Sequence, residues 1–118
     1  MLYYRRPITG ADIMLREFFL GFIKIHILYH ASQAPVYGAE LMEELARHGY
    51  ELSPGTLYPT LHRLHHEGYL TREPRVVGGR VRKYYNITAK GQAALTQARA
   101  KITELVHEVM EERKEALD

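Results

Sequence analysis

The 118-residue chain contains no cysteine and no tryptophan, and it lacks a long uninterrupted apolar run. Without cysteine, disulfides, thiol catalysis, zinc knuckles and iron–sulfur clusters are excluded. The longest apolar stretch, residues 18–29, holds Lys24 and His26 and is shorter than the roughly 20 residues that span a bilayer. The first residues, with Arg5 and Arg6, show no apolar segment followed by a cleavage site. We therefore expect a soluble, cytoplasmic protein without a membrane partner.

The chain also lacks recognisable catalytic machinery. No serine lies in a nucleophile elbow, no glycine-rich phosphate loop occurs, and the HExxH zinc motif is absent. The pairs His26/His30 and His62/His66 have the i, i+4 spacing that places two imidazoles on one metal, but a catalytic zinc needs a third protein ligand. No acidic residue is placed convincingly beside either pair. The sequence therefore predicts no enzyme, no metal site and no cofactor.

The small net charge of +2 hides an uneven distribution along the chain. Residues 53–87 carry six arginines and lysines against two glutamates, whereas the segments before and after each have one more acidic than basic residue. A basic segment in an otherwise near-neutral chain indicates a polyanionic partner. On charge alone, a solvated charged surface remains the alternative. The composition, 46% hydrophobic and 25% charged, is that of a folded globular protein.

The first predicted helix runs from Asp12, its N-cap, to about Ala31, after an N-terminal arm at residues 1–10. Apolar residues occur nearly all the way round this helix, so more than one of its faces must be buried. One subunit of a chain this short does not supply that cover. The pattern therefore indicates a second subunit.

Two shorter helices are predicted next. The first covers about residues 37–48 and is followed by Gly49, a typical residue just after a helix C-terminus. The second has Ser53 as its N-cap and Pro54 at its first helical position, and it stops at Gly68. Two strands follow at residues 69–72 and 81–87, joined through Pro74 and a Gly-Gly turn.

The last helix is predicted to follow Thr88 and to run nearly to the C-terminus. Apolar residues on one of its faces recur at the 3-4 spacing of a heptad, which suits packing against another helix. They are Leu95, Ala98, Ile102, Leu105 and Val109. The order helix, helix, helix, hairpin, long helix predicts a mainly α fold with a β-hairpin wing. We interpret residues 11–87 as a winged helix-turn-helix DNA-binding domain and residues 88–118 as a C-terminal dimerisation helix.

In a winged helix-turn-helix, the second helix of the pair enters the major groove and the hairpin lies on the neighbouring backbone. Leu57, Leu61 and Leu64 form the core stripe of that helix here, and its opposite face carries groups suited to bases and phosphates. The wing arginines are expected to bind phosphates. The alternative is that their charges only prevent the exposed hairpin edge from pairing with other strands. The predicted DNA-contacting residues are Ser53, Gly55, Thr56, Tyr58, Pro59, His62, Arg63, His66, Gly79, Arg80, Arg82 and Lys83.

Several of these segments resemble the PadR family of transcriptional regulators, in the order and spacing of that family, over residues 15 to about 110. The segments are SPGTLYP at 53–59, LHRL at 61–64, EGYL at 67–70, GGRVRKYY at 78–85 and ITAKG at 87–91. The resemblance implies a homodimeric winged-helix repressor that binds an inverted-repeat operator in double-stranded DNA. The single C-terminal helix is similar to that of the short subfamily, which includes multidrug-sensing members.

In dimers of that family the last helix packs with the first helix of the partner, which agrees with the apolar first helix predicted above. The predicted dimer residues are Phe18, Phe22, Ile25, Leu95, Ala98, Ile102, Leu105 and Val109. Multidrug-sensing relatives take flat aromatic compounds between the subunits, often stacked on a tryptophan, a residue that this chain lacks. Our hypothesis is that a small apolar or phenolic effector binds at the interface and lowers DNA affinity. Its predicted pocket comprises Phe18, Phe22, His26, Tyr29 and His30.

Two other binding functions stay open at this point. A protein that coats DNA without sequence preference gains affinity from many phosphate contacts, for which a net charge of +2 is small. A protein–protein adaptor on the same fold would use the basic segment for an acidic partner. Sequence-specific DNA binding is favoured because the basic charge coincides with the predicted groove-facing helix.

Overall fold

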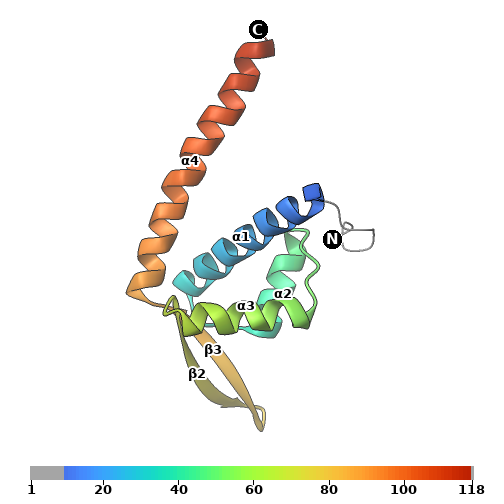
Figure 1. Cartoon of the computed structure of the whole chain (residues 1–118). Helices are drawn as coiled ribbons and strands as arrows, with labels where there is room; N and C mark the ends of the chain where they lie inside the picture. Colours follow the sequence, from blue (N-terminus) through green and yellow to red (C-terminus); the bar gives the residue numbers. More distant parts are fainter. Residues whose placement is uncertain (1–9, 118) are drawn as a thin grey trace.

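The structure, a computed structural model, describes residues 10–117 of the chain. The predicted arm therefore lies outside the described residues, except for Gly10. The elements in chain order are α1 (Gly10–Gln33), β1 (Val36–Tyr37), α2 (Gly38–Arg47), α3 (Pro54–His66), β2 (Leu70–Val77), β3 (Arg80–Ile87) and α4 (Ala89–Leu117). Figure 1 shows α1, α2 and α3 packed together, with the β2–β3 hairpin projecting on one side and α4 running away on the other. This arrangement confirms the mainly helical fold with a winged hairpin.

The core lies where one face of each of the first three helices meets the base of the sheet. Leu41 and Leu45 of α2 and Leu57 and Leu61 of α3 are completely buried, as their helical spacing predicts. The remaining core residues come from α1, from the strands and from the start of α4; they include Ile23, Ile27, Leu28, Ala31, Val36, Leu70, Tyr85 and Leu95. Removing these side chains from water supplies the main stabilisation of so small a domain.

The helix ends follow the sequence signals with two corrections. Gly49 and Gly68 have φ angles of +90° and +87°, so glycine suits the turn that leaves α2 and α3. Asp12, the predicted cap of the first helix, lies inside α1, because that helix already begins at Gly10. Ser53 precedes α3 as predicted, but its hydroxyl makes no capping bond to a helix N–H and lies 3.3 Å from the Thr56 hydroxyl instead.

The sheet has three antiparallel strands in the order β1-β3-β2, of which the sequence predicted only two. Strand β1 is missing from the prediction because two residues are too few to show an alternating pattern. Strand β2 extends to Val77, so Pro74 lies within a strand rather than in a connection. Proline fits there because β2 is an edge strand and its missing N–H interrupts no pairing on the outer side. The turn between β2 and β3 consists of Gly78 and Gly79, both with positive φ.

The start of α4 is fastened to the segment that follows α3. The Thr88 hydroxyl accepts the Gly91 N–H at 3.0 Å, which confirms the predicted cap, and it donates to the Gly68 carbonyl at 2.6 Å. Lys90 Nζ donates to the Glu67 carbonyl at 2.7 Å. Gly91 is buried so closely against the Tyr69 carbonyl oxygen that any added Cβ would collide with it. Helix α4 therefore begins at a fixed position relative to α3 and the wing.

Candidate nucleic-acid interface

The outer face of α3 carries every polar residue that the sequence assigned to it. Tyr58, Pro59, His62, Arg63 and His66 are exposed, whereas the three leucines of the same helix are buried. Ser53 and Gly55 are exposed at its N-terminal end, with Thr56 half-buried beside them. Pro54 has no N–H, and the Thr56 and Leu57 N–H groups donate to the Ser53 carbonyl, so in the first turn of α3 the Gly55 N–H is the backbone donor left for an anion such as a phosphate.

The cationic side chains of the wing differ in how strongly they are held by their own chain. Arg80 and Lys83 are exposed, together with Gly79 at the turn. The Arg82 guanidinium lies 4.0 Å above the Tyr37 ring and donates to the Tyr84 hydroxyl at 3.4 Å. That hydrogen bond is the main reason why the pKa of Arg82 is raised above its ordinary value. The Arg82 guanidinium is therefore held against the sheet, whereas the Arg80 and Lys83 side chains are exposed.

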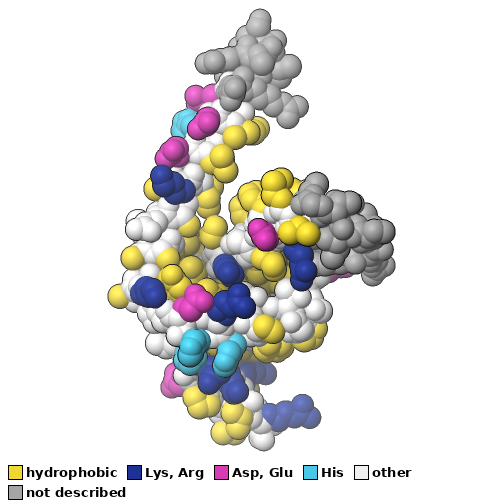
Figure 2. All heavy atoms as spheres, viewed as in Figure 1, with side chains coloured by type: hydrophobic (Ala, Val, Ile, Leu, Met, Phe, Trp, Pro, Cys, Tyr) yellow, Lys and Arg dark blue, Asp and Glu magenta, His cyan; other side chains and the backbone are white. Residues whose placement is uncertain are grey.

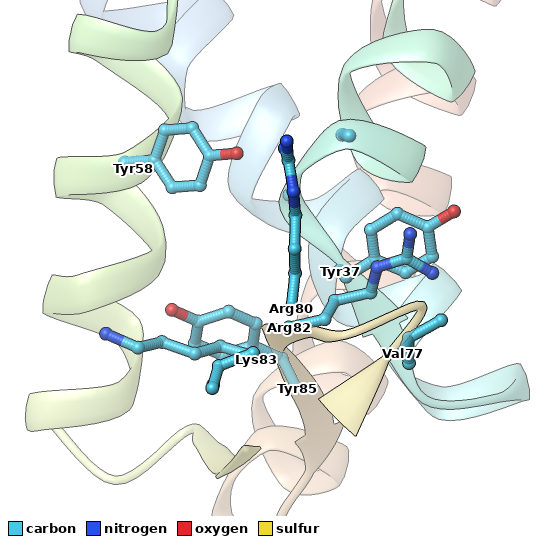
Figure 3. A pocket seen from close by; sticks show the side chains of 10 residues that line it. Tyr37, Tyr58, Val77, Arg80, Arg82, Lys83 and Tyr85 are labelled. Atoms are coloured by element: carbon cyan, nitrogen blue, oxygen red, sulfur yellow. The ribbon is translucent and has the colours of Figure 1, made fainter. Parts of the chain in front are cut away.

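A groove of about 370 Å³ lies between the wing, the start of α2 and α3. Figure 3 shows the side chains that line it. Tyr58 from α3 and Arg80 and Lys83 from the wing line it together, so residues far apart in the sequence face one space. Gly38 at the start of α2 lets the Tyr58 ring lie directly on that helix, since an added Cβ would overlap the ring. Sequence patterns missed Gly38 and Tyr37, because their roles arise only from packing between elements.

The histidines near the C-terminal end of α3 do not all share one environment. His62 and His66 are exposed, but His65 is half-buried. The pKa of His65 is lowered, first by burial and then by the positive Arg72 and the neighbouring histidines His62 and His66. Burial and the neighbouring positive groups therefore disfavour a positive charge on His65. We call Tyr58, His62, Arg63, His66, Arg80 and Lys83 the basic face; Figure 2 shows histidine and cationic side chains gathered where α3 meets the wing.

A second surface, on α1 and α4, is apolar and is left uncovered by the other residues that the structure describes. The exposed fraction of the side chain is 48% for Phe18 and 52% for both Leu105 and Val109. Phe22, Ile25, Ala98 and Ile102 are half-buried between these two helices. We call Phe18, Phe22, Ile25, Ala98, Ile102, Leu105 and Val109 the apolar face; Figure 2 shows hydrophobic side chains along one edge of α4 and over the N-terminal part of α1.

One predicted dimer residue does not belong to the apolar face. Leu95 is only 2% exposed and is part of the core of its own chain. The heptad spacing predicted it as a dimer contact, but the core of its own chain already covers this end of α4. Of the dimer residues predicted on α4, those from Ala98 onward are left partly or largely exposed.

A cavity of about 310 Å³ lies between α1 and α4, next to the apolar face. Four of the five predicted pocket residues line it, namely Phe22, His26, Tyr29 and His30. Phe18 does not; its ring packs edge-on against the Phe22 ring, with centroids 4.6 Å apart. The predicted pocket did not include the other lining residues, which are Ile25, His48, Leu95, Arg99 and Ile102.

The described residues contain no helix with the length and apolar character needed to cross a membrane. Residues 27–97 match the family model described as the transcriptional regulator PadR-like family. The chain is 53% identical over 96 residues to the transcriptional regulator Rv3488 of Mycobacterium tuberculosis. The matched region covers 81% of this chain and 90% of that protein.

Solved structures show the same architecture. A PadR-like transcription factor from Bacteroides fragilis superposes with a TM-score of 0.74 at 29% identity, over 85% of this chain and 98% of that one. A PadR family transcriptional regulator from Eggerthella lenta gives a TM-score of 0.73 at 32% identity, over 86% and 89%. These relatives are regulators of transcription and not enzymes, in agreement with the absence of catalytic motifs. The chain therefore belongs to the PadR-like family of transcriptional regulators.

Proposed function

We propose that the protein is a homodimeric repressor that binds an inverted-repeat operator in double-stranded DNA. The observation that carries this proposal is the basic face, on which α3 and the wing both expose cations and hydrogen-bond donors. Arg80 and Lys83 of the wing share a groove with Tyr58 of α3. The wing projects away from the free end of α4, so DNA and a second subunit have separate surfaces (Figure 1). Occupation of a promoter by such a dimer blocks transcription.

Each subunit inserts α3 into the major groove and lays the wing on the flanking backbone. Ser53, Gly55 and Thr56 at the start of α3 approach phosphates, with the two hydroxyls and the Gly55 N–H as donors. The residues of α3 that face the DNA major groove and read its bases are Tyr58, Pro59, His62, Arg63 and His66. The wing residues that contact phosphates are Gly79, Arg80, Arg82 and Lys83.

The dimer forms through the apolar face, with α4 of one subunit against α1 of the other. Side chains such as Phe18, Leu105 and Val109 are about half exposed in the single chain, and a contiguous apolar surface of this kind marks an interaction site. In this division residues 11–87 form the DNA-binding domain and residues 88–118 the dimerisation helix. The arm at residues 1–10 has no assigned role.

The cavity between α1 and α4 takes a small apolar or phenolic effector that lowers DNA affinity. Phe22, Tyr29 and Ile102 supply apolar walls, and His26 and His30 supply polar atoms that suit a hydroxyl. The cavity adjoins the apolar face, so an occupant changes how the two subunits pair. A panel of apolar and phenolic compounds tests this role; no change in DNA affinity or melting temperature for any compound contradicts it.

Fluorescence anisotropy tests the central proposal, with DNA from upstream of the protein's own gene and a scrambled control at two salt concentrations. We expect tight binding to the upstream DNA and a preference over the scramble that persists at the higher salt. Equal binding to both, with a steep salt dependence, identifies a nonspecific DNA coat. Absence of binding to both DNAs, and to a genomic fragment library, favours the adaptor function. Light scattering on the same sample measures whether the protein is a dimer.

A further inference from the structure

The fold brings a third histidine to the pair on α1. His26 and His30 lie one turn apart on α1, and His48, which follows α2, packs beside them. One ring nitrogen from each of the three lies within 4.8 Å of the others. The His26 and His48 ring centroids are 4.9 Å apart. Among the described residues this is the single group of three metal-ligating side chains, and the pair His62/His66 on α3 gains no such partner.

The second observation concerns a buried nitrogen. His30 Nε2 is inaccessible to solvent, and no hydrogen-bond partner for it exists in the part of the chain that the structure describes. A buried polar atom without a partner is costly, and such atoms in native proteins usually have a role. The Glu44 Oε2 lies 3.9 Å from this nitrogen, which is beyond hydrogen-bond distance. A metal ion bound between these groups would satisfy it.

Glu44 adds a carboxylate to the three imidazoles. Its Oε2 lies 3.9 Å from His30 Nε2 and 3.9 Å from His48 Nε2. Its other oxygen accepts a hydrogen bond from Arg47, which holds the carboxylate on this side of α2. The cluster therefore offers three imidazole nitrogens, with the Glu44 carboxylate next to two of them.

We propose that His26, His30 and His48, with Glu44 as the fourth ligand, bind one divalent transition-metal ion of the zinc type per chain. Three imidazoles and a carboxylate suit Zn²⁺, Co²⁺ or Ni²⁺ rather than Ca²⁺ or Mg²⁺, which prefer oxygen. Zinc–nitrogen bonds of about 2.0–2.1 Å place tetrahedral ligands roughly 3.4 Å apart, so the side chains close by about 1 Å on binding. The exposed His48 side chain has room for that movement.

The bound ion would connect α1 to the end of α2, the first helix of the helix-turn-helix. The three histidines also line the 310 Å³ cavity, so the ion would occupy one wall of the pocket assigned above to an organic effector. The site itself does not depend on DNA binding or on dimerisation, because all four ligands come from one chain. Metal binding is therefore measured on the protein alone.

Calorimetric titration of chelator-treated, untagged protein with Zn²⁺ is the direct test. We expect one ion per chain, and a loss of affinity of at least about tenfold in each of His30→Gln and His48→Gln. Titration with Co²⁺ gives a second readout, the visible absorption of a four-coordinate ion, which both variants lose. His62→Gln/His66→Gln is the matched control, since it removes an i, i+4 pair from α3, and it is expected to bind as the wild type does.

A thermal melt distinguishes the loss of a metal ligand from a loss of folding in the variants. Zn²⁺ is expected to raise the melting temperature of the wild type but not that of His48→Gln, whose metal-free melting temperature stays unchanged because the side chain is exposed. No zinc uptake by the wild type overturns the proposal. Undiminished uptake by both His30→Gln and His48→Gln also overturns it, and loss of uptake in the α3 control instead assigns the ion to His62 and His66.

Discussion

Helices α1 and α3 each carry two histidines four residues apart, yet the two pairs have different surroundings. On α3 the pair is exposed beside Arg63, on a face that no other described residue covers. On α1 the pair is half-buried, meets His48 and borders a cavity closed by α4. Spacing along one helix determines which side chains share a face. The neighbouring elements determine whether that face meets solvent and DNA or another part of the protein.

The same contrast separates the apolar face of α1 and α4 from the basic face of α3 and the wing. In the proposed function, the apolar face makes dehydrated contact with a second subunit, whereas the basic face gains from long-range attraction and polar contacts to DNA. Substitutions on the two faces should therefore affect separate measurements first.

The largest effect is expected from Leu105→Arg on the apolar face. A charge at this half-exposed position cannot be buried against a partner helix without a large desolvation penalty, so the dimer dissociates. Loss of the second DNA-binding unit then lowers operator affinity by about a hundredfold to ten-thousandfold. Light scattering measures the mass and anisotropy measures the affinity. Thr103→Arg, which adds the same charge outside the seam, should remain dimeric; a dimeric Leu105→Arg contradicts our assignment of α4.

A sharper comparison uses two adjacent residues on opposite sides of α3. Leu61→Ala removes a completely buried side chain and should lower the free energy of unfolding by about 2–5 kcal/mol. His62→Ala, on the exposed side, should change it by less than about 0.5 kcal/mol while weakening operator binding. Chemical denaturation measures the first quantity and anisotropy the second. Equal destabilisation by both variants would show that the outer side of α3 serves the fold.

Arg63→Ala should weaken operator binding by about 1–3 kcal/mol, the usual contribution of a base-reading arginine. It should also relax the preference for the operator over scrambled DNA, because a lost base contact affects only the specific complex. Lys101→Ala on α4 removes the same charge far from the basic face and should leave both affinities unchanged. A uniform loss on both DNAs would instead assign Arg63 to a phosphate.

The smallest effect is expected from Arg82→Ala in the wing. Because Arg82 is stacked on Tyr37, it offers a positioned charge to the backbone and should contribute equally to any DNA sequence. Operator and scrambled DNA should lose affinity by the same factor, and the salt-dependence slope should fall by about one. Lys83→Ala provides the comparison with an exposed lysine. A loss restricted to the operator contradicts a phosphate contact for Arg82.

Much of the fold was predictable because its signals are local. The buried leucines of α2 and α3 follow helical spacing, Gly49 and Gly68 mark the helix ends, and the Gly-Gly turn marks the wing. Each of these features depends on neighbours within a few residues along the chain. The outer face of α3 was predictable for the same reason, since its polar residues lie opposite the leucines.

The features that the sequence did not predict depend on contacts between distant segments. Strand β1 exists because Val36 and Tyr37 pair with Tyr85 and Tyr84, far along the chain. Leu95 follows a heptad pattern, but a pattern does not tell which helix will cover it. The third histidine was missed in the same way, because His48 is 18 residues from His30 and approaches it only after α2 has packed on α1.

The fastening of α4 at Thr88 and Lys90 makes this helix a rigid lever arm. Because its base is joined to the backbone at Glu67 and Gly68, just after α3, a rotation of α4 carries the recognition helix with it. In a dimer, the pairing angle of two such levers would set the separation of the two α3 helices. Successive major grooves on one side of DNA recur about every 34 Å. A tilt of a few degrees at the subunit interface, multiplied along the arm, would thus decide whether both recognition helices reach their grooves together.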